Sequence, residues 1–581
     1  MVRRPACGER PVGGREGNVA LALTIPPVAS PSGTEAPRAQ LFPALTAEQM
    51  ARITSHGRVR SVQAGEVLLE AGERKPRIFV VTAGRLEVVR PSPLGEDLVT
   101  VLERGEFSGE VGTLAGRPVL VRIRALEPGE VIEVDRDHLL SIVQNDTELS
   151  DLMMRAFILR RVQLVARGLG DVVLVGSSHC SGTLRIKEFL TRNSHPYSEI
   201  DLDVETDVQA LLDRFQVSVA DIPVLICRSK TVLRNPTNQQ IADCLGFNAA
   251  IDQTKPRDLV IVGAGPSGLA AAVYAASEGL DVLVVEANAP GGQAGASSRI
   301  ENYLGFPAGI SGQDLTTRAQ AQAQKFGAQL MVASGATRMV CSRKPYRIAV
   351  DGGQEIEAWA VILATGAEYR KLALENVTAF EGAGIYYSAT AMEAKLCRGE
   401  EVIVVGGGNS AGQAAVFLAE TTRRVHMLVR SGGLAESMSR YLIRRIEQHP
   451  SIDLRLGTEI VSLQGDRHLE RVTWLNSGTG ATETQDLRHV FVMAGALPNS
   501  RWLAGCVALD SMGFIRTGAD LTPEDLAAAR WSLPRAPHLL ETSLSGVFAV
   551  GDVRSGNLKR VASAVGEGSI AVALVHRVLR E

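Results

Sequence analysis

Two glycine-rich runs in this chain have the residue types and spacing that bind the pyrophosphate of a dinucleotide. The first is Gly263-Ala-Gly265-Pro-Ser-Gly268, and the second is Gly406-Gly-Gly408-Asn-Ser-Ala411. Glycines at these positions permit a tight turn and a close approach of the backbone, and the helix that follows directs its amide groups at the phosphates. The sequence therefore predicts two dinucleotide sites in one chain.

The segments around the first run have the order that such a site needs. An apolar strand at residues 259–262 precedes the glycines, and an alanine-rich helix at residues 269–277 follows them. A second strand, residues 282–285, ends at Glu286, about 20 residues further on, where a carboxylate binds ribose hydroxyls. This order predicts an adenine dinucleotide in the first unit.

The second unit differs at the end of its second strand. A strand at residues 402–405 leads into the glycines, a helix is expected from near Ser410, and Ala411 is small enough to keep the helix close to the strand. Residues 425–429 form the next strand, and Arg430 follows it in place of an acid. A guanidinium there binds a 2′-phosphate, which favours NADPH over NADH, and the alternative is a solvated surface arginine.

Two further apolar strands connect these units. Residues 360–364 run into a small-residue turn at Thr365 and Gly366, and residues 547–550 run into Gly551 and Asp552. This order resembles the pyridine nucleotide-disulfide oxidoreductases, and most closely thioredoxin reductase, over residues 256–581. The resemblance implies an FAD domain (256–372 and 500–581) interrupted by an NADPH domain (373–499).

The resemblance also implies a role for each matching residue. The expected FAD-binding residues are Gly263, Gly265, Pro266, Ser267, Gly268, Glu286, Gly292, Gln293, Asn302, Thr365, Gly366, Gly551, Asp552 and Val561, the last at the start of a helix facing the flavin. The expected NADPH-binding residues are Gly406, Gly408, Asn409, Ser410, Ala411 and Arg430.

The redox pair of that family is missing from its place. Thioredoxin reductases carry Cys-Ala-Thr-Cys just ahead of the NADPH fingerprint, whereas residues 388–391 are Ser-Ala-Thr-Ala here. Neither Ser388 nor Ala391 can cycle between thiol and disulfide. No other CxxC occurs, and no residue identifies itself as a catalytic acid, base or nucleophile, so the expected chemistry is hydride transfer to flavin alone. The acceptor stays open between a thioredoxin-like dithiol, a quinone, dioxygen and a ferredoxin.

Residues 41–166 have short strands punctuated by glycine, a pattern typical of a small antiparallel barrel or jelly roll with closing helices. The segment resembles a cyclic nucleotide-binding domain at residues 107–110 and 124–125. That resemblance implies a ribose contact at Glu110, but Val119 stands where the phosphate-binding arginine belongs, with Arg117 and Arg122 as alternatives. Cyclic nucleotide binding and a degenerate docking or dimerisation domain both stay open.

Residues 171–250 resemble a thioredoxin or glutaredoxin fold. A βαβ unit is followed by a helix at 207–215 and by a strand that opens at Ile222-Pro223, the position of a cis-proline in those folds. Cys180 lies ahead of a helix, whose N-terminus favours a thiolate, but Thr183 replaces the resolving cysteine. The alternatives are monothiol chemistry at Cys180 and a non-catalytic adaptor.

Composition narrows the remaining classes. The chain has 581 residues, 45% of them hydrophobic and 22% charged, with a net charge of −3, so nothing favours nucleic acid. We expect no metal site and no apolar run near the roughly 18 residues of a membrane span. Seven cysteines without framework spacing fit a cytoplasmic protein. We also expect a disordered tail at residues 1–40 and a homodimer.

The sequence thus predicts a multidomain protein with a β jelly-roll barrel, a thioredoxin-like α/β domain and two Rossmann-like three-layer domains. The predicted function is an FAD-dependent NADPH oxidoreductase with an unidentified acceptor. The alternative is a sensor that binds FAD, NADPH and a cyclic nucleotide without turning over.

Overall fold

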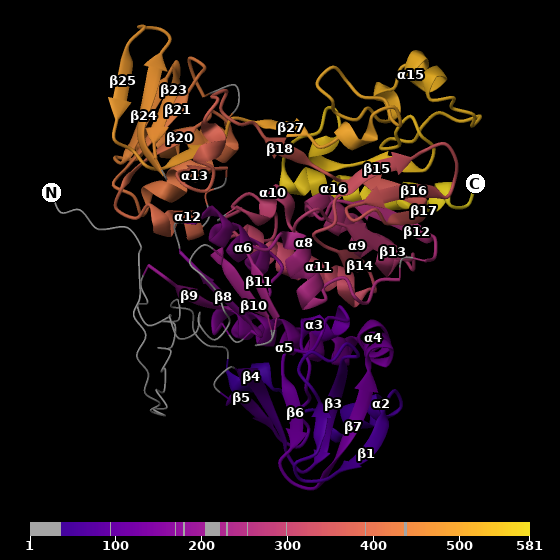
Figure 1. Ribbon diagram of the computed structural model, residues 1–581. Coiled ribbons are helices and arrows are strands. Elements are labelled where there is room, and N and C mark those ends of the chain that lie inside the picture. Colours follow the sequence, from indigo (N-terminus) through magenta and orange to yellow (C-terminus); the bar gives the residue numbers. More distant parts are fainter. Residues whose placement is uncertain are drawn as a thin grey trace, which may run out of the picture.

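The computed structural model describes residues 37–581 except 93–94, 169, 178–179, 204–220, 228–230, 253, 298, 388, 390, 435–437 and 467. Four parts follow one another in space (Figure 1). The N-terminal barrel (residues 37–166) lies at one end, and the second domain (residues 171–250) follows it. Residues 257–366 and 500–581 together build the third domain, and the inserted domain between them, drawn in orange, projects to the side.

Residues 37–166 form two antiparallel sheets, in the orders β1-β7-β3 and β2-β6-β4-β5, that enclose an aliphatic core. The strands are β1 (Arg58–Val62), β2 (Val67–Leu69), β3 (Arg77–Ala83), β4 (Leu86–Ser92), β5 (Gly95–Leu102), β6 (Arg122–Ala125) and β7 (Gly129–Asp135). The helices are α1 (Arg38–Leu41), α2 (Ala47–Thr54), α3 (Val111–Leu114), α4 (Arg136–Asn145) and α5 (Thr147–Ala166).

The expected tail at residues 1–40 is too long by a few residues, since α1 begins at Arg38. The Arg38 guanidinium pairs with Glu106 and donates to the Val101 carbonyl at 2.8 Å, which ties this helix to the barrel. The rest of the expected tail lies outside the described residues.

The second domain has a four-stranded sheet in the order β11-β10-β8-β9, in which β8 and β9 are parallel and the other pairs antiparallel. Its elements are β8 (Val172–Gly176), α6 (Ser181–Arg192), β9 (Ser198–Asp201), β10 (Val224–Cys227), β11 (Thr231–Arg234) and α8 (Asn238–Leu245). The Ile222–Pro223 peptide bond is cis, as the resemblance implies. The helix expected at 207–215 lies outside the described residues.

Two boundaries in this domain differ from the sequence pattern, which predicts a helix from Thr183 and a strand at residues 200–203. Helix α6 begins at Ser181, two residues before Thr183. Strand β9 ends at Asp201, because the Asp201 carboxylate accepts a hydrogen bond from the Asp203 backbone amide at 3.0 Å and so turns the chain.

The FAD-type domain is a sheet in the order β14-β13-β12-β17-β16-β15, with β28 from the end of the chain paired to β17. Leu259 and Ile261 pack under α9, α11 and α16, while Val260 and Val262 face the opposite layer. Its strands are β12 (Arg257–Val262), β13 (Val282–Val285), β14 (Gln329–Met331), β15 (Ala336–Val340), β16 (Tyr346–Val350), β17 (Glu355–Leu363) and β28 (Val547–Ala549). Its helices are α9 (Pro266–Ser277), α10 (Gly292–Gly295), α11 (Gly312–Lys325), η3 (Arg501–Leu503), η4 (Gly518–Asp520), α15 (Pro523–Ala528), η5 (Gly551–Val553) and α16 (Val561–Val578).

The inserted domain has a parallel sheet, β19-β26-β20-β21-β22, and a separate antiparallel sheet, β23-β24-β25. Its strands are β19 (Ile385–Tyr386), β20 (Glu401–Val405), β21 (Arg424–Val429), β22 (Ile452–Leu456), β23 (Thr458–Gly465), β24 (Leu469–Asn476), β25 (Thr482–Gln485) and β26 (Val490–Val492). Its helices are η2 (Val377–Ala379), α12 (Ala391–Leu396), α13 (Asn409–Ala419) and α14 (Arg440–Gln448).

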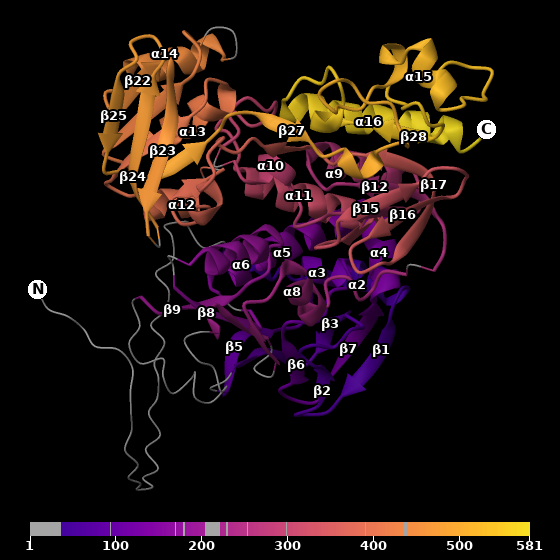
Figure 2. The same cartoon turned by 45° about the horizontal axis from the view of Figure 1, so that its top comes forward.

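A two-stranded ribbon joins the inserted domain to the FAD-type domain. Strands β18 (Ala367–Tyr369) and β27 (Ala496–Pro498) pair antiparallel. The chain therefore enters and leaves the inserted domain along two neighbouring strands (Figures 1 and 2). Beyond the ribbon, Arg445 of α14 reaches back to Glu301 with an Nη1–Oε2 distance of 3.1 Å.

A disulfide that the sequence did not predict joins Cys341, after β15, to Cys506, after η3. The strand register places it away from the first glycine-rich run. Val340 lies opposite Arg347 on β16, and the adjoining part of β16 pairs with β17 near Ala358, opposite Arg257, the first residue of β12. The glycines follow the last residue of β12. The disulfide therefore lies near the opposite end of the strands from the glycine-rich run.

The expectation that no apolar run approaches the length of a membrane span is wrong for one segment. Among the described helices, α16 is long and apolar enough to cross a membrane by length and composition. Its apolar face packs on α9 in the core of the FAD-type domain. The approach is close, since a Cβ on Gly568 would lie 2.3 Å from the Ser267 carbonyl oxygen. Packing against a neighbouring helix accounts for this composition.

Candidate functional site

The glycines of the first run fall into two kinds. A Cβ on Gly263 would lie 2.3 Å from the Ala364 carbonyl oxygen, and one on Gly268 would lie 1.9 Å from that of Gly263. These two glycines are required by packing inside the protein. Gly265 is different, because the nearest protein atom to its Cβ position is 3.9 Å away. It leaves the open space that a pyrophosphate needs.

Helix α9 starts at this open glycine without a side-chain cap, and α13 and α16 also begin uncapped. By contrast, side chains cap the starts of α2, α5, α8 and α11. The first amides of an uncapped helix remain available to an anion. These three helices all begin at positions that the sequence assigned to cofactors, although α6 and α14 also lack a side-chain cap.

Glu286 is held at the end of β13 as the prediction requires. Its carboxylate accepts hydrogen bonds from the backbone amides of Ala264 at 2.8 Å and Asn288 at 3.0 Å. The acid therefore closes the glycine loop and holds its position beside it. Each carboxylate oxygen can accept more than one hydrogen bond, so both retain capacity for ribose hydroxyls.

Of the next predicted FAD contacts, Gly292, Gln293 and Asn302, the first lies against Gly265. Gly292 approaches it, with 3.0 Å between the Gly292 Cβ position and the Gly265 Cα, and Gln293 donates a hydrogen bond to the Ala367 carbonyl oxygen. Asn302 is exposed in the loop after Ile300. The structure thus brings Gly292 to the glycine loop and leaves Asn302 on the surface.

The turn at Thr365 is tied to the ribbon that enters the inserted domain. The Thr365 hydroxyl donates to the Asn499 carbonyl oxygen at 2.8 Å, and the Asn499 amide donates back to the Thr365 carbonyl at 3.1 Å. Gly366 has a positive φ of 65° and no protein atom within 4 Å of its Cβ position. The turn is therefore fixed at its base and open on its surface.

The C-terminal segment supplies the last predicted residues of the first site. The Gly551 amide donates to Glu567 at 2.7 Å, and a Cβ on Gly551 would meet the Ser267 hydroxyl at 2.5 Å. Burial raises the pKa of Asp552, although Lys559 nearby acts to lower it. Val561 is the first residue of α16, as the sequence predicted.

The second run is built in the same way, except that Ala411 stands where the first run has Gly268. Gly406 has a φ of 140°, and a Cβ there would lie 2.4 Å from the Met493 carbonyl oxygen and 3.1 Å from the Ala411 Cβ. Gly408 is the N-cap residue of α13, and Ala411 is buried. The Asn409 carboxamide oxygen accepts from the Ser439 amide at 2.9 Å, which fixes the start of α14, while Ser410 stays exposed.

Arg430 follows β21 and is exposed. In the described part of the chain it makes no hydrogen bond or ion pair. Its place at the carboxyl end of the strand next to the glycine run agrees with a 2′-phosphate contact, and its exposure agrees equally with a surface arginine.

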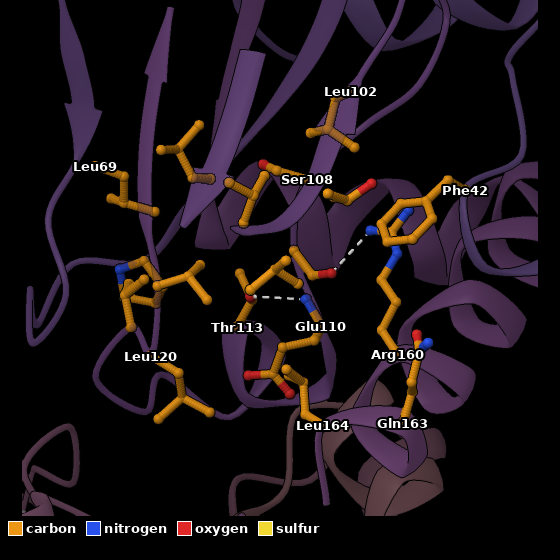
Figure 3. Close-up of a pocket in the computed structure, with 18 of the residues that line it drawn as sticks. Phe42, Leu69, Leu102, Ser108, Glu110, Thr113, Leu120, Arg160, Gln163 and Leu164 are labelled. Carbon is orange, nitrogen blue, oxygen red and sulfur yellow. Dashed lines mark hydrogen bonds between the residues drawn. The ribbon is translucent and has the colours of Figure 1, made fainter. Parts of the chain in front are cut away.

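The barrel contains a cavity of about 80 Å³ behind α3, drawn in Figure 3. Glu110 caps α3 by accepting from the Gly112 amide at 2.8 Å, and its carboxylate lies 3.3 Å from Arg161 Nη1. The Val119 backbone forms hydrogen bonds with the backbones of Glu73 and Gly72. These bonds hold the loop in place, and the apolar Val119 side chain forms part of the cavity wall.

The two alternative phosphate ligands have other partners. Arg117 donates to the Asn193 carbonyl oxygen at 3.0 Å and stacks on Phe247, and burial lowers the pKa of Arg117 to about 9. Arg122 pairs with Glu70 and Glu96 on the surface. Neither guanidinium replaces the phosphate-binding arginine that is missing at position 119.

Comparison with known proteins agrees with this geometry. A family model for pyridine nucleotide-disulphide oxidoreductases matches residues 257–568, more than half of the chain. The chain belongs to this family. A second model, for cyclic nucleotide-binding domains, matches residues 59–146.

Relatives within the family are thioredoxin reductases. The Bacillus subtilis thioredoxin reductase is 31% identical over 57% of this chain and 97% of its own length. The Arabidopsis thaliana NADPH-dependent thioredoxin reductase 3 is 30% identical over 60% of this chain and 65% of its own length. The solved thioredoxin reductase of Lactococcus lactis superposes with a TM-score of 0.50 and 25% identity, covering 56% of this chain and 99% of that one.

Thioredoxin reductases use FAD and NADPH, the two cofactors that the sequence predicts for this chain. The residues present fit both groups, because the open glycine, the uncapped helices and the ribose-side acid all lie together in the first unit. The second unit supplies an uncapped helix and an arginine in place of the acid.

The position of the family's redox pair is only partly described. Ser388 lies outside the described residues, and Ala391 is the first residue of α12. Just before this segment, Gly382 approaches the second domain, since its Cβ position is 3.0 Å from the Ser181 Cβ. The start of α6, where Cys180 is the N-cap residue, therefore lies beside the segment that leads to residues 388–391.

Cys180 itself is a partly exposed free thiol. Gly182 lies against cis-Pro223, with 3.0 Å from its Cβ position to the proline Cγ. Thr183, which replaces the resolving cysteine, is fully buried, and its hydroxyl has no partner among the described residues. The structure thus brings Cys180 and the cis-proline into one region and leaves no second thiol beside them in the described part of the motif.

Sequence reasoning missed two features. The Cys341–Cys506 pair is 165 residues apart with no spacing pattern to announce it. Arg160, on α5, is buried in the wall of the barrel cavity. An arginine in the apolar repeat of a helix that closes a barrel was the available signal.

Proposed function

We propose that this protein is an FAD-dependent NADPH oxidoreductase that passes electrons to an external acceptor without a dithiol relay of its own. The carrying observation is that two complete dinucleotide units, joined by the β18–β27 ribbon, accompany a relay position in which Ser388 and Ala391 replace both cysteines. With both cofactors bound, the chemistry that they would supply is hydride transfer from the nicotinamide to the flavin, followed by delivery of two electrons to the acceptor.

The chain's own residues align the two cofactors and tune their surroundings. The amides of α9 and α13 would hold the pyrophosphates, and the amides at the start of α16 would face the flavin and favour negative charge there. The partly buried carboxyl of Asp552 lies three residues beyond β28, where the family resemblance places the ribitol. No step of this chemistry needs a side chain to carry a proton between the two cofactors.

Anaerobic reduction tests this function. Mixing the purified yellow protein with NADPH in the absence of air should bleach the flavin within seconds, and a later addition of a quinone, a ferredoxin, a thioredoxin or dioxygen should show which acceptor restores the colour. A flavin that stays oxidised with NADPH would instead support the sensor alternative, in which the three bound ligands report by domain rearrangement.

A thioredoxin-coupled disulfide assay tests the missing relay. We expect negligible turnover with an ordinary thioredoxin and slow oxygen consumption, because no thiol pair stands at the relay position. We also propose that the second domain is a thioredoxin-like adaptor and that Cys180 is, among the described cysteines, the thiol placed to give a bypass, since α6 begins uncapped at that residue.

Cys180→Ser and a matched Cys244→Ser variant of the same domain separate the possibilities. Turnover that disappears only in Cys180→Ser would identify the bypass. Robust turnover that survives Cys180→Ser would contradict both the missing relay and the bypass.

A further inference from the structure

The cavity of the barrel is lined mainly by hydrocarbon. Leu69, Val88, Val99 and Leu120 form much of its wall, and Arg160 and Gln163 of α5 lie across from the aliphatic side (Figure 3). A cavity of about 80 Å³ exceeds the roughly 10–15 Å³ that one water needs on the same measure. It is therefore large enough for the body of a small ligand.

Arg160 is a charged group of this wall that forms no ion pair among the described residues. Its Nε donates to the Leu41 carbonyl oxygen at 2.7 Å and its Nη1 to that of Gly109 at 2.9 Å. Nη2 has no hydrogen-bond partner among the described residues, although the side chain is only 5% exposed. The guanidinium lies between two rings, 4.6 Å from the Phe42 centroid and 4.7 Å from that of Phe107.

The other charged groups of the wall are already bonded. Arg77 pairs with Glu73 and Glu133, so its charge is neutralised although its Nε has no partner. Arg117 is directed to Asn193, and Arg167 has a partner of its own.

Glu110 of the same wall is committed to the α3 cap and to Arg161. A buried guanidinium nitrogen without a partner favours an anionic oxygen, because the charge-assisted bond would replace lost hydration.

The arrangement does not suit a cyclic nucleotide. Its phosphate would need a cation near Val119, where the wall is apolar and the backbone is fixed by bonds of 3.1 and 2.7 Å to Glu73 and Gly72. Val119, Leu120 and Val121 succeed one another along that stretch, and their side chains offer a phosphate no hydrogen bond.

We propose that this cavity binds a small carboxylic acid with an apolar body, whose carboxylate pairs with Arg160 and whose body lies against Val88, Val99 and Leu120. The ligand class is that of short fatty acids. This inference concerns the barrel alone and does not depend on the proposed oxidoreductase function.

Calorimetric titration of the full-length flavoprotein with octanoate, 1-octanol and 3′,5′-cyclic AMP tests the proposal. Octanoate should bind at least tenfold more tightly than 1-octanol, which has the same chain without the charge, and cyclic AMP should give no heat. Absence of octanoate binding, equal binding of octanoate and octanol, or tighter binding of cyclic AMP would each overturn it.

Two variants locate the site. Arg160→Met should abolish the preference for octanoate over octanol, while Arg155→Met, on the exposed side of the same helix, should leave it unchanged. Because Arg160 also supports Leu41 and Gly109, its variant risks misfolding the barrel. Val99→Phe keeps that arginine and fills the cavity from the opposite wall, so unchanged octanoate affinity in this variant would overturn the proposal.

Discussion

The two dinucleotide units share one architecture but differ in how far the protein itself completes them. In the first unit, Glu286 is bonded to the glycine loop, Thr365 is bonded to Asn499, and the last segment of the chain closes the site through Gly551. In the second, Arg430 is exposed and has no partner in the described part of the chain. A site that is organised before binding suits a resident cofactor, and an open one suits a cofactor that enters and leaves at every turnover.

The strongest test of this difference is Gly265→Val. The backbone at Gly265, with φ −71° and ψ −177°, accepts valine, and the nearest protein atom leaves room for the new side chain. Only the cofactor would be displaced, so the variant should fold and lose essentially all of its FAD. Absorbance of the purified protein measures the flavin content.

Gly478→Val, in an exposed turn of the inserted domain, is the control and should remain yellow. Normal flavin content in Gly265→Val would mean that the first unit does not bind the pyrophosphate.

An intermediate effect is expected from Arg430→Ala. The 2′-phosphate alone distinguishes NADPH from NADH, and a charged hydrogen bond to it changes the preference on the order of 10- to 100-fold. The variant should lose efficiency with NADPH and keep it with NADH in anaerobic flavin reduction.

Arg424→Ala, at the other end of the same strand, should change neither rate. An equal loss toward both cofactors in Arg430→Ala would assign that residue another part and would weaken the contrast between the two units.

The smallest effect concerns Asp552 in the preorganised unit. Because burial raises its pKa, the native carboxyl holds a proton more tightly than the unfolded one, and stability falls as pH rises above about 4. Asp552→Asn removes this ionisation. Its melting temperature without FAD should therefore gain on wild type between pH 4 and pH 7, by on the order of 2 °C.

Thermal melts of FAD-stripped protein at several pH values provide the measurement, with Asp520→Asn, an exposed carboxyl of the same segment, as the control. If the melting temperature of Asp552→Asn relative to wild type instead fell as pH rises, the pKa of Asp552 could not be raised by burial.

Much of the catalytic half was predictable because its signals are local. Glycine spacing, strand hydrophobicity and the acid at Glu286 all act within about 30 residues. The cis bond at Pro223 was also predictable from the order of the elements around it. The roles of Arg117 and Arg122 were not, because their partners Asn193, Glu70 and Glu96 are chosen by tertiary packing and not by the residues next to them.

The same limit applies to Arg160 and to the disulfide. The cavity that Arg160 lines exists only once α5 is placed across from the β2-β6-β4-β5 sheet. The Cys341–Cys506 pair depends on the last segment of the chain returning to the β15 edge. Neither contact follows from a sequence pattern, since each joins segments that meet only in the folded protein.

The Cys341–Cys506 disulfide closes a covalent loop in the chain that the order of the domains along the sequence does not reveal. The closed loop spans 165 residues and contains the β18–β27 ribbon and everything between its two strands, so the entire NADPH domain lies within it. A single protease cut inside that domain would leave two fragments still joined through the FAD domain. On a non-reducing gel the nicked protein would migrate as one species, and a reducing agent would separate it into two.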